Sequence, residues 1–159
     1  MSNAFLSVVG SKQGQFRGDA EVESRQAEWM TLAAVHMGLE SPRDSTSGEA
    51  TGRRQFSLVT ITKFWGAASV QGLSACSENE VLTEVVLQFT RLDAEGRDHI
   101  FQTVTLTDAT LVSVQRNTVQ NSDGALVGQE DWGFVFRKLE LLDNEAQLVF
   151  SDDWQATTS

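Results

Sequence analysis

Short runs of β-branched and other apolar residues, separated by glycine, asparagine and aspartate, recur along almost the entire chain. Residues 57–63, Ser-Leu-Val-Thr-Ile-Thr-Lys, alternate in the manner of a half-buried strand. In residues 81–91 the same period of two places Val85, Leu87 and Phe89 on one face. Similar runs occupy residues 5–9, 100–106, 110–115, 132–142 and 147–150. Many short strands of this kind indicate a mainly β chain folded as a barrel or a sandwich.

Two segments have helical spacing instead. Residues 21–40 are good helix formers whose apolar side chains recur every three or four positions, so local reasoning predicts a helix there. Residues 67–77 place Val70, Leu73 and Cys76 three positions apart. This second pattern predicts one short helix with those three side chains on its buried face.

Residues 41–55 pass without one large apolar side chain. They contain the only proline of the chain, Pro42, and three arginines, Arg43, Arg53 and Arg54. A connection of this length inside a compact domain is uncommon and is usually functional or disordered. Because lengthening a loop costs only about 0.6 kcal/mol per doubling, a tolerated insertion is the alternative interpretation.

Several segments agree, in order and spacing, with one known family. They are Ala4-Phe-Leu6 with Gly10, Gly14-Gln-Phe-Arg-Gly18, Ser41-Pro-Arg-Asp44 followed by Gly48, Thr51-Gly-Arg-Arg-Gln55, Thr60-Ile-Thr-Lys63, Leu82-Thr-Glu-Val-Val-Leu-Gln-Phe89 and Ser151-Asp-Asp-Trp154. Together they resemble the haemolysin-coregulated protein (Hcp) family, the tube proteins of bacterial type VI secretion. The likeness runs from about Ala4 to Trp154, and residues 1–3 lie before it as a candidate remnant of cloning.

The resemblance implies a single tube-subunit domain over residues 1–159. Its expected fold is a β-barrel of two packed antiparallel sheets, with one short α-helix and a long extended loop at about 41–55. The resemblance also places a strand at residues 29–38. We expect a strand there in place of the locally predicted helix, because tertiary context can override local propensity. Residues 138–144 depart from the alternating tryptophan and threonine of many members, so a differently shaped hairpin is expected over 138–150.

The function implied by the resemblance is structural. Six copies would form a ring, and rings would stack into a hollow tube that is expelled with a spike protein and can carry effectors. Partners would be further copies of the chain, the spike, sheath and baseplate components, and effectors in the lumen. The candidate ring-stacking residues are Pro42, Arg43, Asp44, Gly48, Gly52, Arg53, Arg54 and Gln55. The alternatives are a monomeric β-barrel that binds a small ligand, and a phage tail-tube protein of the same architecture.

The composition of the chain argues against several classes of binding partner. The net charge of −10 argues against nucleic acid, because phosphate binding needs a concentrated basic surface, and no polybasic membrane attachment segment is present. No run approaches the roughly 18 apolar residues of a membrane span, and no early segment resembles a signal peptide. A single cysteine, Cys76, fits folding in a reducing compartment. We therefore expect a cytoplasmic protein while the tube is assembled, and later export without a cleavable leader.

No catalytic or metal-binding pattern emerges from the sequence. His36 and His99 lie far apart and outside any ligand-spaced cluster, so neither a metal nor a cofactor is expected. Cys76 would need a spatially adjacent histidine to act as a nucleophile. Residues 48–54 have too few residues between the glycines for a phosphate-binding loop and lack its lysine. An enzyme, which would need one histidine beside a carboxylate or Cys76, is the less favoured alternative.

Overall fold

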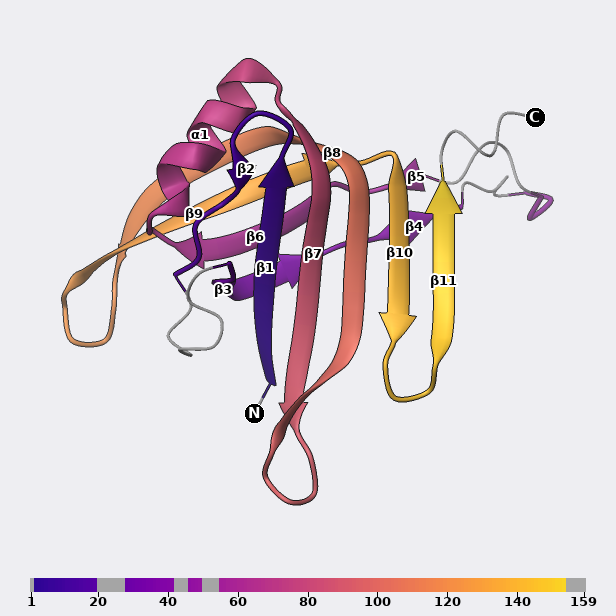
Figure 1. Ribbon diagram of the computed structural model, residues 1–159. Helices are drawn as coiled ribbons and strands as arrows, with labels where there is room; N and C mark the ends of the chain where they lie inside the picture. Colours follow the sequence, from indigo (N-terminus) through magenta and orange to yellow (C-terminus); the bar gives the residue numbers. More distant parts are fainter. Residues whose placement is uncertain (1, 20–27, 42–45, 50–54, 154–159) are drawn as a thin grey trace.

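The computed structural model describes residues 2–19, 28–41, 46–49 and 55–153, and in these ranges the chain is mainly β, as the sequence predicts (Figure 1). The strands are β1 Ser2–Gly10, β2 Gly14–Gln15, β3 Met30–His36, β4 Leu39–Glu40, β5 Gln55–Phe56, β6 Val59–Phe64, β7 Val81–Leu92, β8 Asp98–Gln120, β9 Leu126–Val135, β10 Lys138–Asp143 and β11 Leu148–Asp153, and the helix is α1 Ala68–Glu78. Within the described ranges, no helix has both the length and the apolarity to cross a membrane.

Six strands close into a barrel. Antiparallel pairing leads from β8 through β7, β1, β3, β6 and β9 and then back to β8. β10 and β11 extend the same sheet outward from β8, and β2 pairs with the end of β1. β4 and β5 form a separate two-stranded ribbon. The expected barrel is therefore present, but the two packed sheets that the resemblance implies are joined in one continuous nine-stranded sheet.

The longest strand, β8, is the branch point of this sheet. On one side it pairs with β7 over most of the length of β7. On its other side residues 102–107 pair with β10, whereas residues 110–120 pair with β9. Asp108 lies between these two partners with a φ of 50°, a left-handed conformation that aspartate tolerates better than most residues. The two β-rich runs that the sequence indicates on either side of Asp108 are thus parts of one strand that changes partners there.

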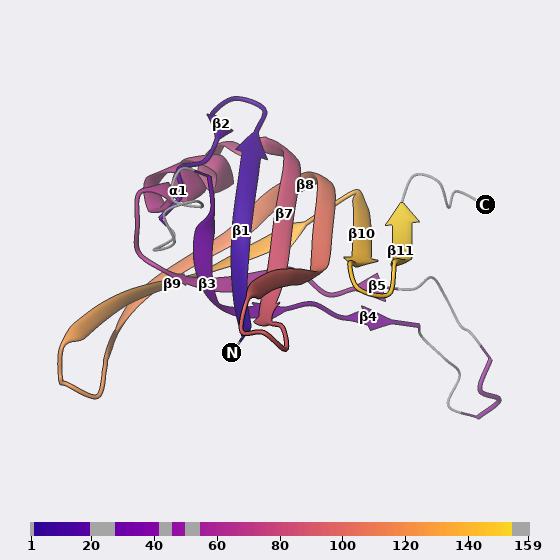
Figure 2. The same ribbon diagram turned by 60° about the horizontal axis from the view of Figure 1, so that its bottom comes forward.

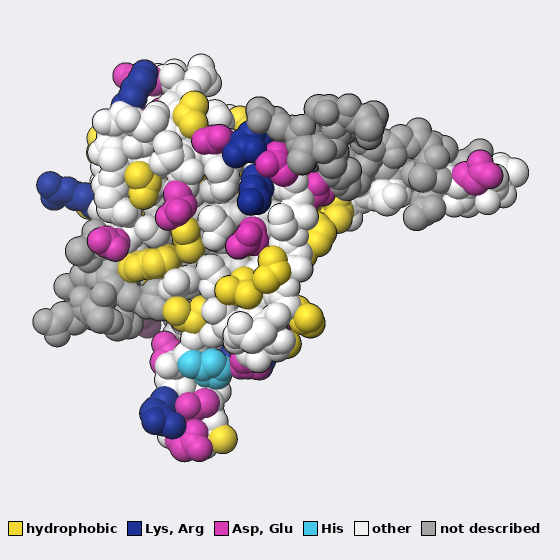
Figure 3. Space-filling view, turned by 45° about the vertical axis from the view of Figure 1, so that its right-hand side comes forward, with side chains coloured by type: hydrophobic (Ala, Val, Ile, Leu, Met, Phe, Trp, Pro, Cys, Tyr) yellow, Lys and Arg dark blue, Asp and Glu magenta, His cyan; other side chains and the backbone are white. Residues whose placement is uncertain are grey.

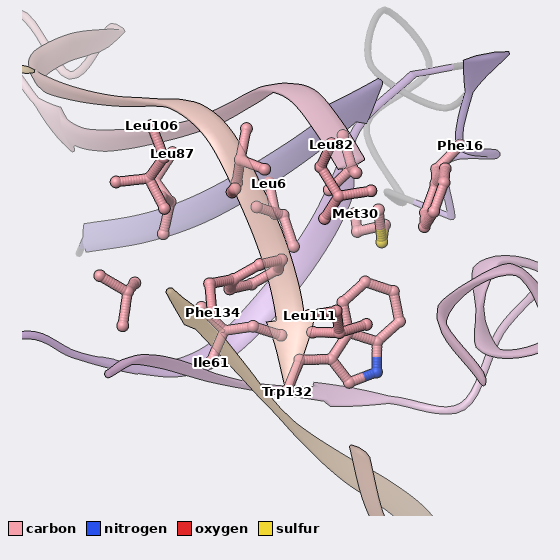
Figure 4. Close-up of a cluster of buried hydrophobic side chains, with 14 of the residues drawn as sticks. Leu6, Phe16, Met30, Ile61, Leu82, Leu87, Leu106, Leu111, Trp132 and Phe134 are labelled. Carbon is pink, nitrogen blue, oxygen red and sulfur yellow. The ribbon is translucent and has the colours of Figure 1, made fainter. Parts of the chain in front are cut away.

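The core fills the inside of the barrel. Side chains from β1, β3, β6, β7, β8 and β9 converge there, among them Leu6, Met30, Ile61, Leu87, Leu111, Trp132 and Phe134 (Figure 4). Trp132 makes edge-to-face contacts with Phe16 and with Phe134, at 6.3 Å between ring centroids in each pair. Alternation along β7 is as predicted, since Val85 and Leu87 are buried while Glu84 is exposed.

Residues 29–38, for which local spacing predicts a helix and the resemblance a strand, contain a strand, β3. β3 lies between β1 and β6 and pairs with both. Its first half alternates, with Met30 and Leu32 buried. The register then shifts between Leu32 and Ala34, so that Val35 contacts the core from an odd-numbered position. This irregularity breaks the period of two, and it explains why residues 29–38 do not read as a strand in isolation.

The helix is present where predicted, but the prediction of its buried face was wrong. α1 buries its small residues Ala68, Ser69, Gly72 and Ala75. Val70 is 74% exposed and Leu73 is 41% exposed, while Cys76 is partly buried against the core. The cause is Trp132: a Cβ at Gly72 would collide with its indole ring. Only the small face of the helix can lie this close to the barrel, so the large apolar face is turned outward.

Candidate functional site

The candidate stacking loop is anchored at both ends by the β4–β5 ribbon. Leu39 pairs with Phe56 and Glu40 with Gln55, and the Ser57 N–H donates to the Gly38 carbonyl at 2.9 Å. Of the predicted stacking residues, Gln55 begins β5, and Gly48 has a left-handed φ of 75°. The others, Pro42, Arg43, Asp44, Gly52, Arg53 and Arg54, lie outside the described residues. The ribbon leads away from the barrel on the side of β10 and β11 (Figure 2).

An apolar cleft lies between this ribbon and the β10–β11 hairpin. It has a volume of about 230 Å³ and is lined by Met37, Gly38, Leu39, Phe56, Leu139, Leu141 and Phe150. The ring of Phe56, one of the lining residues, also meets the Phe136 ring edge to face, with 5.3 Å between their centroids. The lining offers almost no polar group, so the cleft is suited to an apolar side chain of another protein and lacks the convergent polar groups that orient a small ligand.

In the described part of the chain, the neighbouring strand β11 is an uncovered sheet edge. Among the described residues it pairs only with β10. Leu148 is 69% exposed and Val149 60% exposed, and Phe150 lines the cleft while remaining exposed. Figure 3 shows apolar side chains interspersed with acidic ones on the side of the molecule that carries β10 and β11. Exposed apolar edge strands promote pairing with other chains, and natural proteins normally shield them.

A second, smaller apolar patch lies on the outside of the barrel, over β6, β8 and β9. Leu58, Val112 and Val135 are each between 41% and 46% exposed. Gly133 lies beside Leu58, and a Cβ there would collide with Ser113 and crowd Leu58. This patch differs in its residues from the edge of β11, and the outward face of α1, with Val70 and Leu73, is exposed as well.

A buried ion pair, Lys63 with Glu130, lies beneath α1 and is hydrogen-bonded to neighbouring side chains. Lys63 and Glu130 are fully buried, with 3.4 Å between the Lys63 Nζ and the Glu130 Oε1. The same oxygen accepts from the Ser69 hydroxyl at 2.9 Å, and the other Glu130 oxygen accepts from the Arg116 Nε at 3.1 Å. Lys63 follows Val59 and Ile61 on the inward face of β6, so the alternation itself indicated a buried lysine. Our sequence reasoning missed this pair.

The histidine predictions have two different outcomes. His36 ends β3 and is not brought to a carboxylate by any hydrogen bond described here, whereas the His99 Nε2 lies 2.6 Å from the Glu145 Oε1. The arrangement that an enzyme would require is therefore met in distance at His99. However, Glu145 also accepts two hydrogen bonds from Arg91, so its lone pairs are used to join two hairpins. In the described ranges no three His, Cys, Asp or Glu side chains are grouped as metal ligands.

These contacts give a prediction for the titration of Glu145. Hydrogen bonds from His99 and from Arg91 lower the pKa of Glu145 below its usual 4.5. Because the pKa is lower in the folded state, the stabilisation is present above pH 4.5 and is lost as the pH falls through the lowered pKa. His99→Ala should move the Glu145 pKa back toward 4.5, as followed by the carboxyl ¹³C shift in an NMR titration. An unchanged pKa in this variant would show that the histidine contact is not formed in solution.

Taken together, the fold and the surfaces define a β-barrel protein whose features suit contact with other chains. Comparisons with known proteins identify the family of this chain. The family described as "Type VI secretion system effector, Hcp" matches residues 5–142, and the chain therefore belongs to the Hcp family.

Relatives of known sequence or structure extend the match to nearly the whole chain. It is 30% identical to the "Major exported protein" of Pseudomonas aeruginosa, over 96% of this chain and 95% of that protein. A solved structure described as Hcp protein superimposes with a TM-score of 0.87 at 22% identity, covering 97% of this chain and 98% of the other. The secreted protein Hcp3 of Pseudomonas aeruginosa has a TM-score of 0.79 at 24% identity, covering 97% and 99%.

Proposed function

We propose that this chain is a structural subunit of the type VI secretion tube that assembles into six-membered rings, and that it has no catalytic activity. The observation that carries the proposal is the match to the Hcp family over residues 5–142. It is supported by the uncovered apolar edge of β11 and the apolar cleft beside it. As its relative is named an exported protein, we propose that this chain too is exported through the secretion system after assembly in the cytoplasm.

Ring closure requires a heterologous contact, in which two different surfaces of the same chain meet. The edge of β11 with its cleft is the first surface in our proposal. The patch of Leu58, Val112 and Val135 is the second. Both are apolar and are formed by different residues, so contact between them in successive copies would hide both from water.

Stacking of rings is assigned to the loop of residues 41–55 in our proposal. Each subunit has a net charge of −10, so successive rings repel one another unless cationic groups lie at their contact. Arg43, Arg53 and Arg54 supply three of the twelve basic residues of the chain within one short segment. Arginine binds carboxylates through a planar fork, which suits a contact with an acidic neighbouring ring. Spike, sheath and baseplate proteins and carried effectors are the further partners, and no cofactor is required.

The test separates ring closure from stacking. Native mass spectrometry of the wild type should show one species of six times 17.5 kDa. Val149→Asp should weaken ring closure by more than about tenfold, because it places an unpaired carboxylate in an apolar contact. The triple variant Arg43→Ala, Arg53→Ala, Arg54→Ala should keep its rings but lose tubes in electron micrographs, and Arg97→Ala, which removes a 76% exposed arginine, is the matched control.

Each contrary outcome has a definite meaning. A wild type that stays monomeric at tens of micromolar would contradict the tube proposal and favour the ligand-binding barrel, although the barrel interior is filled by side chains such as Trp132 and Phe134. Loss of rings as well as tubes in the triple arginine variant would indicate that the loop contributes to the contact within a ring. Retention of both would indicate that the loop is a tolerated insertion with no role in assembly.

A further inference from the structure

The β10–β11 hairpin is attached to the barrel along one side only. Residues 138–143 of β10 pair with residues 102–107 of β8, and β11 pairs only with β10 among the described residues. A two-stranded hairpin is marginally stable by itself, and one joined along a single strand can twist about that strand. The direction in which β11 presents its apolar edge therefore depends on what holds the two ends of the hairpin.

Arg137 holds the open end. It lies in the short link between β9 and β10, and its N–H donates to the Thr107 carbonyl at 3.1 Å. Its Nε donates to the Asp108 Oδ2 at 3.0 Å, and one terminal nitrogen donates to the Asp153 Oδ2 at 2.8 Å. One guanidinium thus joins the point where β8 changes partners to the last residue of β11. These contacts raise the pKa of Arg137, with the hydrogen bond to Asp108 as the main cause.

Arg91 and His99 hold the closed end. Glu145 lies in the turn between β10 and β11 and accepts from the Arg91 Nε at 3.2 Å, from a terminal nitrogen of Arg91 and from the His99 ring. The Arg91 guanidinium lies 4.5 Å from the centroid of the Phe101 ring, which keeps it in place. The turn is also joined to β8, because the Asn144 N–H donates to the Phe101 carbonyl at 2.8 Å.

These two clusters lie at the surface and are expected to add little to global stability. Arg91 and Glu145 are 47% and 40% exposed in their side chains, and Asp108 is 47% exposed, while Arg137 and Asp153 are 29% and 24% exposed. Exposed ion pairs generally add little to the free energy of unfolding. They do restrict geometry, since an arginine fork fixes the direction of the groups it binds.

We propose that Arg137 and Arg91 are positioning residues, which hold the β10–β11 hairpin in the orientation that its apolar edge needs to contact another copy of this chain. The inference rests on the proposed self-assembly. It adds to that proposal the two polar clusters on which the shape of the contact depends. It also accounts for the placement of arginines at both ends of the hairpin in a chain with only twelve basic residues.

The test measures hairpin motion and assembly separately. Hydrogen exchange is followed for residues 138–153 in the double variants Arg137→Gln, Val149→Asp and Arg91→Gln, Val149→Asp. The reference is the single variant Val149→Asp, so that ring assembly does not protect the hairpin in either protein. Exchange in the hairpin should be faster by about tenfold or more, the equivalent of about 1.4 kcal/mol, while exchange in β1 and β7 stays unchanged. In the otherwise wild-type chain, Arg137→Gln and Arg91→Gln should each raise the protein concentration at which half of the subunits are assembled by about tenfold or more.

Controls make the assignment specific. Arg97→Gln removes another arginine from the β7–β8 turn, where its ion pairs among the described residues are with Asp93 and Glu95, and it should change neither measurement. Asp108→Asn keeps a residue that tolerates the left-handed backbone but removes the charge. If Arg137 acts through Asp108, combining both substitutions should have less effect than the sum of the single ones.

The outcomes are distinguishable from failure of the proposed function. Unchanged exchange in residues 138–153 would overturn the positioning role whether or not the protein forms rings. Faster exchange with unchanged assembly would overturn its connection to the contact. If the wild type itself did not assemble, the tube proposal would fail, and the exchange measurement would still decide whether the arginines hold the hairpin.

Discussion

Glu130→Ala is expected to lower the free energy of unfolding by about 3–5 kcal/mol, the usual cost of removing one partner from a buried ion pair. The side chains of Glu130 and Lys63 have no exposed surface, and Lys63 also donates to the Phe64 carbonyl at 2.7 Å. Removing the carboxylate leaves the ammonium with Asp19, at 3.5 Å, as its remaining acidic partner, and it leaves the Ser69 hydroxyl without its acceptor. Equilibrium unfolding in urea at neutral pH gives the value directly.

A double variant tests the cause of this loss. Lys63→Met with Glu130→Leu replaces the pair by apolar side chains of similar size, and such exchanges are often neutral or stabilising. Most of the lost stability should return, because Arg116, which is 36% exposed, can reach water when its acceptor is gone. Glu95→Ala, at an exposed ion pair, should stay within about 0.5 kcal/mol of the wild type. A single Glu130→Ala variant as stable as that control would contradict the buried pair.

Trp132→Ala should have an effect of similar size, about 3–5 kcal/mol, through lost burial and the cavity that remains. Trp132 is the largest fully buried side chain described, and it contacts the rings of Phe16 and Phe134. Its Nε1 has no hydrogen-bond partner among the described residues, so truncation loses apolar contact without losing a hydrogen bond. The loss should appear as a lower denaturant midpoint with an unchanged m-value.

The matched control for Trp132→Ala is Val70→Ala, on the outer face of the helix that covers Trp132. Val70 is 74% exposed, and its truncation should change stability by no more than about 0.5 kcal/mol. If Val70→Ala instead cost as much as a core substitution in the unassembled chain, the helix would face inward as its spacing first suggested, and the small-residue contact over the indole would be wrong.

Local pattern determined much of this fold. Alternation in β6 and β7 predicted both strands, and in β7 it also placed Val85 and Leu87 on one face, because a half-buried strand repeats every two residues whatever its partners are. The position of the short helix followed in the same way from residues 67–77. Composition contributed the net charge of −10, which already argued against a nucleic-acid partner. The order and spacing of motifs from Ala4 to Trp154 indicated the Hcp family, to which the match over residues 5–142 shows that the chain belongs.

The candidate site was only partly predictable. The stacking loop could be recognised from its composition, and the structure adds that the β4–β5 ribbon joins its two ends. The apolar edge of β11 was not foreseen, because whether a strand lies at an edge depends on the order of strands in the sheet. The arginine clusters were also missed: Arg91 and Glu145 are 54 positions apart, and no local signal connects them.

Tertiary structure alone decided the features that depend on contacts between residues far apart in the sequence. Residues 30–36 form a strand because β1 and β6 offer hydrogen bonds on both sides, which outweighs a local preference for helix worth only tenths of a kcal/mol per residue. α1 turns Val70 outward because the indole of Trp132, sixty positions away, leaves room for nothing larger than Gly72 beneath it. A sequence sets the period of its apolar residues, but the direction in which a face points is set by the volume that the rest of the chain leaves free.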